Sequence, residues 1–267
     1  MSEASLDYFL ADKPGAELTA TLITEACQTL RHNRDDYLAQ VGNEPIIAKL
    51  TEVSGLWRSP DYELRKIALA AGPEETGFPP EVLAAGLDAC FADWTQEKFF
   101  MLLAQEFGDA TRLQSFTSQP NQTLSMVHGP QLIAHIAPGN LPVPVFQSIA
   151  FGLLLRSAQF VKCASGKSLL PRLFGHSLHT VEPGLAASLE IAEWKGGSEP
   201  LESALFAEAD CVVASGSDES ILATRQRLPL AKRLVGYGHR VSFGYVEKLA
   251  CEVMGTQAIL SRAADDV

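Results

Sequence analysis

The sequence predicts an α/β fold, with a helical N-terminal region over residues 1–124 followed by a mostly parallel sheet over residues 125–267. In the first half, apolar residues recur at helical spacing, as they do on the buried face of an amphipathic helix. In the second half, short apolar runs alternate with helical segments of about 10–15 residues. This alternation is typical of βαβ units, whose successive strands run parallel.

The first half is expected to contain five helices, of which the first two have the clearest apolar faces. The residues on these faces are Leu18, Leu22, Ala26 and Leu30, then Ile46, Leu50, Val53 and Trp57. Asp61 is expected to cap a third helix that continues to about Ala70. The fourth opens at Pro79 and Pro80, and Thr95 caps the fifth. After these helices, the polar stretch 115–121 is expected to be a loop or a linker.

The second half is expected to contain six strands with helices between them. The expected strands are residues 132–136, 160–163, 189–194, 211–214, 233–235 and 241–243. The expected helices are residues 145–155, 169–181, 199–208 and a segment that ends near residue 227. Each strand is short, apolar and followed by a glycine-rich or polar turn, as expected for a buried parallel sheet.

Charge and hydropathy exclude several classes of partner. The net charge is −11, so the sequence lacks the excess of positive charge that is typical of proteins that bind nucleic acid or an anionic membrane. A phosphate-bearing ligand remains compatible with this charge, because local donors decide its binding. The sequence has no apolar run long enough to span a bilayer. Residues 1–14 lack the features of a signal peptide.

The five cysteines are Cys27, Cys90, Cys163, Cys211 and Cys251. They are odd in number, scattered and without a C-x-x-C pair. We therefore expect reduced thiols in a cytoplasmic protein and no metal site.

Three predicted strand ends are rich in small or polar residues. They are Pro138-Gly139-Asn140, Lys162-Cys163-Ala164-Ser165-Gly166 and Ser215-Gly216-Ser217-Asp218-Glu219. In open parallel sheets, ligands bind outside the carboxyl ends of the strands. Glycine lets backbone amides approach a phosphate, so these loops favour a dinucleotide. The fingerprint G-x-G-x-x-G is absent, and a single loop of this kind is more often an ordinary turn than a ligand site. The order and spacing of the three loops along one alternating pattern strengthen the joint case.

Four longer segments, which include two of these strand ends, carry a resemblance to a known protein family. They are His135-Ile136-Ala137-Pro138-Gly139-Asn140-Leu141-Pro142, Trp194-Lys195-Gly196-Gly197, the segment from Ala209 to Glu219, and Tyr237-Gly238-His239-Arg240-Val241-Ser242-Phe243. Together they resemble the aldehyde dehydrogenase superfamily and, within it, the LuxC-type acyl-CoA reductases. The resemblance covers roughly residues 127–246. It implies a Rossmann-like sheet and the NADPH-dependent reduction of a fatty acyl thioester to an aldehyde through a cysteine acyl-enzyme.

The resemblance also implies roles for individual residues. Asn140 matches the asparagine that donates to the oxyanion, and Lys162 matches the lysine that contacts the adenosine ribose. Gly216 and Ser217 match the loop and helix start at the pyrophosphate. Ser165 stands where non-acylating relatives carry a glutamate for the ribose hydroxyls. A carboxylate there would repel a 2′-phosphate, so its absence favours NADP(H).

Two departures from the oxidising relatives bear on the reaction. The segment 235–240 has no carboxylate where those enzymes place a general base. Water attack on an acyl-enzyme needs such a base, whereas hydride delivery does not, so the sequence favours reduction. His239 in this segment is either a structural residue or an acid or coenzyme A contact.

The resemblance places the nucleophilic cysteine shortly after Val267, so we expect the catalytic domain to be absent and this portion to be inactive alone. The five cysteines present lie in apolar segments and are expected to be small buried hydrophobes. The expected partner is an acyl-CoA or acyl-enzyme thioester, and homo-oligomer formation is left open. Two alternatives remain: a non-catalytic nucleotide-binding module or pseudo-enzyme, and an acyl-phosphate reductase of the same superfamily.

Overall fold

The computed structural model describes residues 7–13, 15, 17–118, 122–139, 143–240 and 243–265. The chain forms two compact units, Met1–Tyr237 and Gly238–Val267. The second unit contains helices α11 (Lys248–Met254) and α12 (Thr256–Asp265). All other described elements belong to the first unit.

Five parallel strands form the central sheet of the first unit in the order β5-β4-β3-β6-β7. The strands are β3 (Leu132–Ile136), β4 (Ala158–Cys163), β5 (Leu189–Glu193), β6 (Cys211–Ser215) and β7 (Arg233–Tyr237). The predicted α/β fold with a parallel sheet is therefore confirmed. Of the strand expected at residues 241–243, the first two residues lie outside the described part of the chain, and Phe243 belongs to no strand.

The helices of the first half lie close to their predicted positions. They are α1 (Ala20–Asp36), α2 (Asn43–Arg58), α3 (Glu63–Thr76), α4 (Pro80–Ala92) and α5 (Gln96–Phe107), with short 3₁₀ turns η1 (Leu10–Asp12), η2 (Leu38–Gln40) and η3 (Ala110–Leu113). Thr95 caps α5 as predicted, because its hydroxyl accepts the backbone N–H of Lys98. Later in the chain come α6 (Val143–Leu154), α7 (Leu169–Val181), α8 (Pro183–Ala186), α9 (Glu199–Glu208) and α10 (Asp218–Arg227).

Two local predictions were wrong. The third helix has Tyr62 at its N-cap instead of Asp61, and it continues through Pro73 to Thr76. Gly77 caps this end in the left-handed conformation. The stretch expected to be only a loop or a linker starts a short antiparallel hairpin, made by β1 (Thr117–Ser118) and β2 (Leu124–Ser125). Two-residue strands leave no hydrophobic periodicity in a sequence, so the polar composition hid the hairpin.

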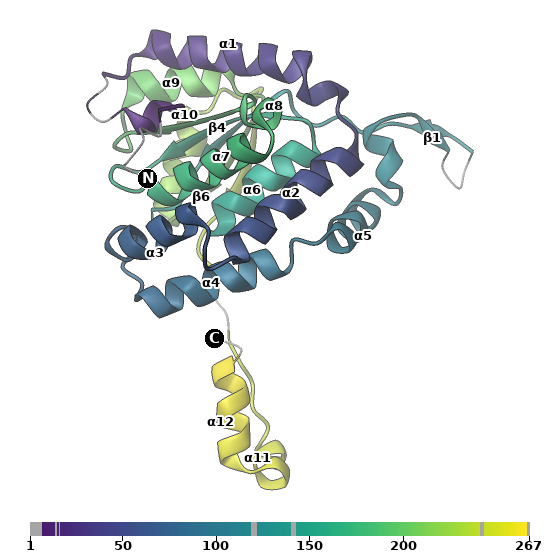
Figure 1. Cartoon of the computed structure of the whole chain (residues 1–267), viewed down its shortest axis with the longest axis vertical. Helices are drawn as coiled ribbons and strands as arrows, with labels where there is room; N and C mark the ends of the chain where they lie inside the picture. The colour runs from purple at the N-terminus through teal and green to yellow at the C-terminus, as the bar shows by residue number, and fades with distance from the viewer. Residues whose placement is uncertain are drawn as a thin grey trace. The chain divides into compact units, whose positions relative to one another are not determined.

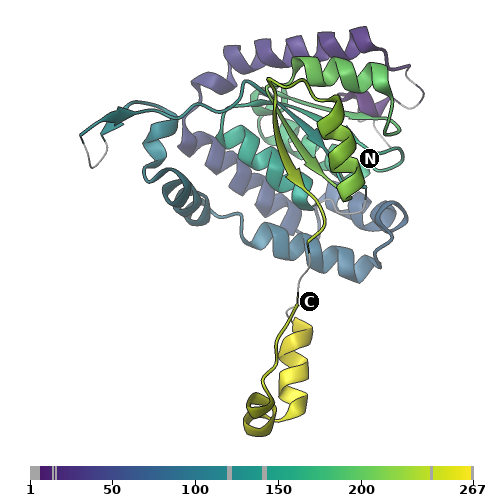
Figure 2. The ribbon, with the colours of Figure 1, turned by 180° about the vertical axis from the view of Figure 1, so that it is seen from behind.

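Helices cover both faces of the sheet. On one face, α1 and α9 pack together over β3, β4 and β5, and α10 lies against β6 and β7. The view from behind shows α9 and α10 in front of the strands (Figure 2). On the other face, α6 and α7 contact the sheet, and α2, α3 and α4 pack outside them (Figure 1).

An aromatic stack joins the helices of the first half to those that cover the sheet. Trp57 of α2 stacks on Phe91 of α4, with 5.3 Å between ring centroids. Phe91 in turn stacks on Phe146 of α6 at 5.9 Å, and Phe146 stacks on Phe174 of α7 at 4.8 Å. All four side chains are completely or almost completely buried. The first-half helices therefore share a core with the sheet layer, and the expected boundary at residue 124 stays a prediction.

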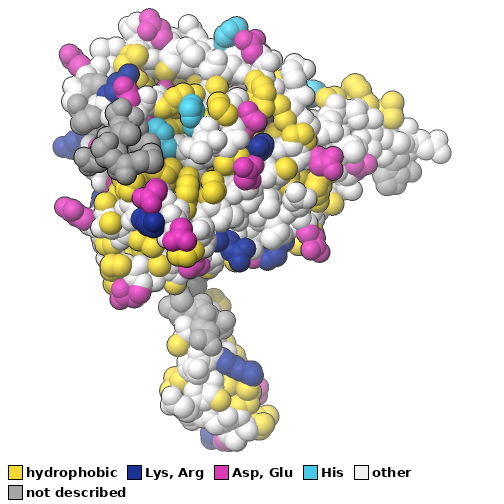
Figure 3. Space-filling model, in the orientation of Figure 1, with side chains coloured by type: hydrophobic (Ala, Val, Ile, Leu, Met, Phe, Trp, Pro, Cys, Tyr) yellow, Lys and Arg dark blue, Asp and Glu magenta, His cyan; other side chains and the backbone are white. Residues whose placement is uncertain are grey.

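The surface of the first unit is mixed in charge on the face that Figure 3 shows, where acidic and basic side chains are interspersed. Among the described residues, no helix has the length and apolarity that crossing a membrane requires.

Asp12 anchors the N-terminal segment to α7. Its side chain is fully buried and accepts hydrogen bonds from the backbone N–H of Phe9 (2.8 Å), from Arg172 Nε (2.6 Å) and from His176 Nε2 (2.8 Å). Burial opposes ionisation of this carboxyl, but these donors hold its pKa well below its usual range. The ionised form therefore stabilises the folded state.

Glu190 of β5 holds the same segment from the sheet edge. Its Oε1 atom accepts the backbone N–H of Leu10 at 2.8 Å and of Ile191 at 2.9 Å. Burial, with a smaller contribution from the nearby Asp12 charge, raises the pKa of Glu190 to about 7. Ionisation of this carboxyl therefore costs the folded state stability.

We predict that Asp12→Ala lowers the free energy of unfolding by about 3–5 kcal/mol, because it leaves buried donors without their anion. The matched control is Asp7→Ala, which removes an exposed carboxylate 3.4 Å from Lys13. It should change stability by less than about 0.5 kcal/mol. Urea unfolding followed by tryptophan fluorescence measures both. Equal unfolding midpoints for the two variants would contradict the anchoring role of Asp12.

For Glu190 we predict a pH-dependent difference. The pKa of Glu190 in the folded state lies above the ordinary 4.5. The stability that its neutral carboxyl gives the folded state is therefore fully present below about pH 4.5 and is lost as the pH rises through about 7. Glu190→Gln keeps the accepting oxygen but cannot ionise, so its stability advantage over the wild type should grow from about pH 5 to about pH 8. Urea titrations across this range test it, with the exposed Glu97→Gln as control. Parallel pH profiles for wild type and Glu190→Gln would count against this account.

Candidate functional site

A cavity of about 730 Å³ opens at the carboxyl ends of β3, β4 and β6. The three loops that the sequence singled out meet here, together with the Gly196-Gly197 turn after β5. Strand β3 lies between β4 and β6, so the order of the strands reverses at this edge. Ligands of open α/β sheets bind at such a reversal point. The volume also lies within the range of small-molecule and cofactor sites.

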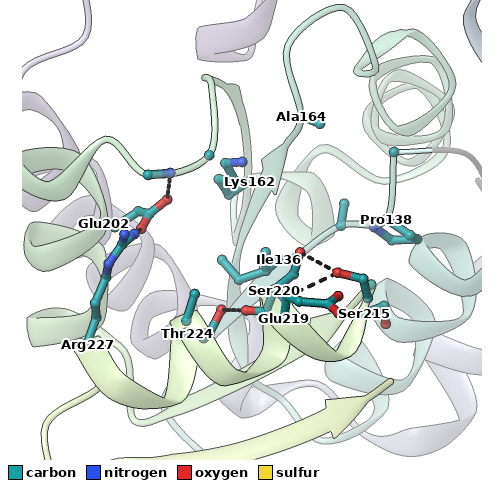
Figure 4. Close-up of a pocket in the computed structure, with 17 residues that line it drawn as sticks. Ile136, Pro138, Lys162, Ala164, Glu202, Ser215, Glu219, Ser220, Thr224 and Arg227 are labelled. Carbon is teal, nitrogen blue, oxygen red and sulfur yellow. Dashed lines mark hydrogen bonds and ion pairs between the residues drawn. The ribbon is translucent and has the colours of Figure 1, made fainter. Parts of the chain in front are cut away.

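Lys162 projects into this cavity from the end of β4 (Figure 4). The residue is 5% exposed, and its Nζ atom lies 5.7 Å from the centre of the Trp194 ring. Burial lowers the pKa of Lys162, whereas the nearby Glu202 carboxylate acts in the opposite direction. A partly desolvated ammonium of this kind gains more from an anionic or hydroxyl partner than a solvated surface lysine does.

The start of α10 forms another wall of the cavity. Gly216 and Ser217 both line it, as predicted for the end of β6. The Ser217 hydroxyl caps the helix by accepting the backbone N–H of Ser220 at 3.3 Å. Gly216 donates its own N–H to the carbonyl of Tyr237, so the loop is tied to β7. The cavity therefore meets the positive end of the α10 dipole.

An ion pair between Glu202 and Arg227 closes the side of the cavity next to Lys162 (Figure 4). Glu202 lies on α9, and its second carboxylate oxygen accepts the backbone N–H of Gly197 at 2.7 Å. Arg227 is the last residue of α10. The sequence analysis missed both residues, because a charged residue on an amphipathic helix normally faces solvent.

The loop after β4 is held by α3. Glu75 accepts the backbone N–H of Leu169 at 2.9 Å, and the Lys167 ammonium donates to the Glu75 carbonyl. On the sheet side, Glu193 accepts the N–H of Gly166 at 2.6 Å. Ser165 in this loop is exposed and is not one of the described residues that line the cavity, whereas Ala164 is. The structure thus brings together Lys162, Gly216 and Ser217 but leaves Ser165 at the periphery.

Asn140 lies outside the described residues, although Pro138 and Gly139 of the same turn line the cavity. The roles predicted for Asn140, Lys162, Ser165, Gly216 and Ser217 stay predictions.

His135 of β3 precedes this turn and connects the strand to β4 and α6. Its Nε2 atom lies 2.9 Å from Gln159 Oε1, and Gln159 donates to the carbonyl of Ile149 at 3.0 Å. Burial lowers the pKa of His135 to about 4, so the ring is neutral at pH 7. Since Gln159 presents its oxygen, Nε2 carries the proton and Nδ1 is an acceptor. The ring therefore acts as a neutral support beneath the strand end.

Four of the five thiols lie in settings that do not favour a nucleophile. Cys27, Cys90, Cys163 and Cys211 are buried, and this burial raises the pKa of each thiol. Cys251 of the second unit is partly exposed. A nucleophilic cysteine needs an accessible, electropositive setting, which the four buried thiols lack.

The chain matches a known protein family over most of its length. A family model described as LuxC acyl-CoA reductase matches residues 38–267 of the chain. A comparison with curated proteins gave no match.

Solved structures of aldehyde dehydrogenases share the fold. A Burkholderia cenocepacia protein assigned as an aldehyde dehydrogenase is 21% identical, with a TM-score of 0.65, and the match covers 83% of this chain and 45% of that chain. Staphylococcus aureus betaine aldehyde dehydrogenase, solved with NAD⁺, is 17% identical (TM-score 0.64; 83% and 43%). A Sinorhizobium meliloti NAD-dependent aldehyde dehydrogenase is 15% identical (TM-score 0.64; 82% and 42%). The chain spans less than half the length of each of these three proteins.

Proposed function

The chain belongs to the LuxC acyl-CoA reductase family, and from this premise we propose that its cavity binds NADP(H) as the cofactor-binding portion of an enzyme that reduces a fatty acyl thioester to an aldehyde. The observation that carries the proposal is the position of the buried Lys162 in a glycine-lined cavity at the reversal point of a parallel sheet. One of the solved proteins that share this fold holds NAD⁺, which supports a dinucleotide as ligand.

In this proposal each wall of the cavity has a distinct task. Lys162 donates to the hydroxyls of the adenosine ribose. The loop Gly216-Ser217 and the first turn of α10 face the pyrophosphate, where the helix dipole favours negative charge. The Pro138-Gly139 turn leads to Asn140, whose amide donates to the developing oxyanion of the thioester.

A bound NADPH would supply a hydride to the thioester, and this hydride together with one proton would convert the thioester into an aldehyde and a thiol. The thiol that carries the acyl group is not one of the four buried cysteines, because their raised pKa values keep them protonated. All five cysteines are free thiols, which supports the cytoplasmic location that we propose.

The proposal also includes a preference for NADP(H) over NAD(H). Among the described lining residues, none is a carboxylate from the loop after β4. In the family resemblance, Ser165 of this loop matches the ribose-binding glutamate of the non-acylating relatives. A 2′-phosphate therefore meets no repulsion from this loop.

We expect Lys162→Met to weaken NADPH binding by about 10-fold to 100-fold, the cost of one hydrogen bond to a charged group. The substitution keeps the length of the side chain and removes the ammonium. Lys49→Met is the matched control, because it removes the same charge from a partly exposed position on α2 beside Glu52. Titration of NADPH and NADH fluorescence with each protein measures the dissociation constants.

Wild-type protein should bind NADPH more tightly than NADH. A wild type that binds neither dinucleotide would refute the proposed function. Unchanged NADPH binding by Lys162→Met would show that the cofactor is held elsewhere, and tighter binding of NADH would refute the stated preference.

A further inference from the structure

The ion pair between Glu202 and Arg227 is an unusual feature of an anion-binding cavity, because a carboxylate repels phosphate. The Glu202 side chain is 11% exposed, and both of its oxygens are engaged, one with the Gly197 N–H and the other with Arg227. Its negative charge is therefore compensated from two directions. The carboxylate positions the guanidinium and the Gly196-Gly197 turn, because each of its oxygens accepts from one of these two protein donors.

Arg227 has donors to spare at this position. A guanidinium carries five N–H donors. Within the described part of the chain, Glu202 is the one ion-pair partner of Arg227, and the Arg227 side chain is 38% exposed. Its Nη2 atom lies 4.0 Å from the point where a Cβ atom on Gly197 would be. The absence of a side chain at Gly197 thus leaves room beside the guanidinium.

Glu202 lies near both Arg227 and Lys162. It pairs directly with Arg227, and its charge acts on the pKa of Lys162. Lys162 and Arg227 therefore lie on the same side of the cavity, as Figure 4 shows. A phosphate monoester that enters this side meets an ammonium and a guanidinium, and guanidinium matches phosphate geometry through two parallel hydrogen bonds.

We propose that Arg227 is the residue that selects NADP(H), by donating to the 2′-phosphate of the adenosine ribose while Glu202 holds the guanidinium in place. This inference rests on the proposed function, since it assigns a cofactor specificity to the same cavity. It gives Arg227 no role for NAD(H), which has a hydroxyl at the 2′ position. Arg227 and Lys162 therefore contribute differently: Lys162 contacts the ribose of both dinucleotides, and Arg227 contacts the phosphate of one.

The test compares Arg227→Gln with Arg225→Gln, which removes an exposed arginine from the same helix outside the cavity. Arg227→Gln should weaken NADPH binding about 10-fold to 100-fold and leave NADH binding unchanged within about twofold. Arg225→Gln should leave both dissociation constants unchanged. Adenosine 2′,5′-bisphosphate and adenosine 5′-monophosphate serve as smaller probes. The preference of the wild type for the bisphosphate should disappear in Arg227→Gln.

A second variant fixes the role of Glu202. Glu202→Gln keeps an oxygen for the Gly197 N–H but removes the carboxylate oxygen that holds Arg227, so it should weaken NADPH binding by less than Arg227→Gln does and leave NADH binding unchanged. Selective loss of NADH binding in this variant would overturn the inference, because Glu202 would then be the ribose ligand of an NAD-specific site.

The outcomes separate this inference from the proposed function. Equal weakening of NADPH and NADH in Arg227→Gln would overturn the selectivity role, because the arginine would then be structural. The proposed function would still stand on the Lys162 result. Retained NADH binding also reports that the Arg227→Gln protein is folded. Failure of the wild type to bind any dinucleotide would remove both claims.

Discussion

The parallel pairing of β4, β3 and β6 is the constraint on which the candidate site depends. Parallel strands end at one edge, so residues far apart in the sequence, such as Lys162 and Ser217, line a single cavity. The same pairing buries β4 on both faces, which takes Lys162 out of water and lowers its pKa. The edge of the sheet thus supplies both the shape of the cavity and its buried positive charge.

The helical first half stabilises this edge from outside. The stack from Trp57 through Phe91 and Phe146 to Phe174 packs α2 and α4 against α6 and α7, the helices that cover the sheet. Glu75 then links α3 to the loop after β4 through the N–H of Leu169. Because this loop leads away from Lys162, the position of α3 and the geometry of the cavity are coupled. The first half is therefore part of the structural support of the site.

Much of the fold could be predicted because its signals are local. The apolar run 132–136 and the polar turn after it predict both ends of β3, and Thr95 predicts the start of α5. The pairing of Glu202 with Arg227 could not be predicted, because the two residues lie 25 positions apart on different helices. Charged residues on helices usually face water. The peripheral position of Ser165 was equally hidden, since it depends on how Glu75 and Glu193 hold the loop.

The most direct test of the central claim is a crystal structure of this chain with NADPH. We predict electron density for the cofactor at the carboxyl ends of β3, β4 and β6. Lys162 Nζ should lie within hydrogen-bond distance of the adenosine ribose, and the 2′-phosphate should lie beside Arg227. An empty cavity at a saturating concentration of NADPH, or a cofactor bound on another surface of the unit, would contradict the account.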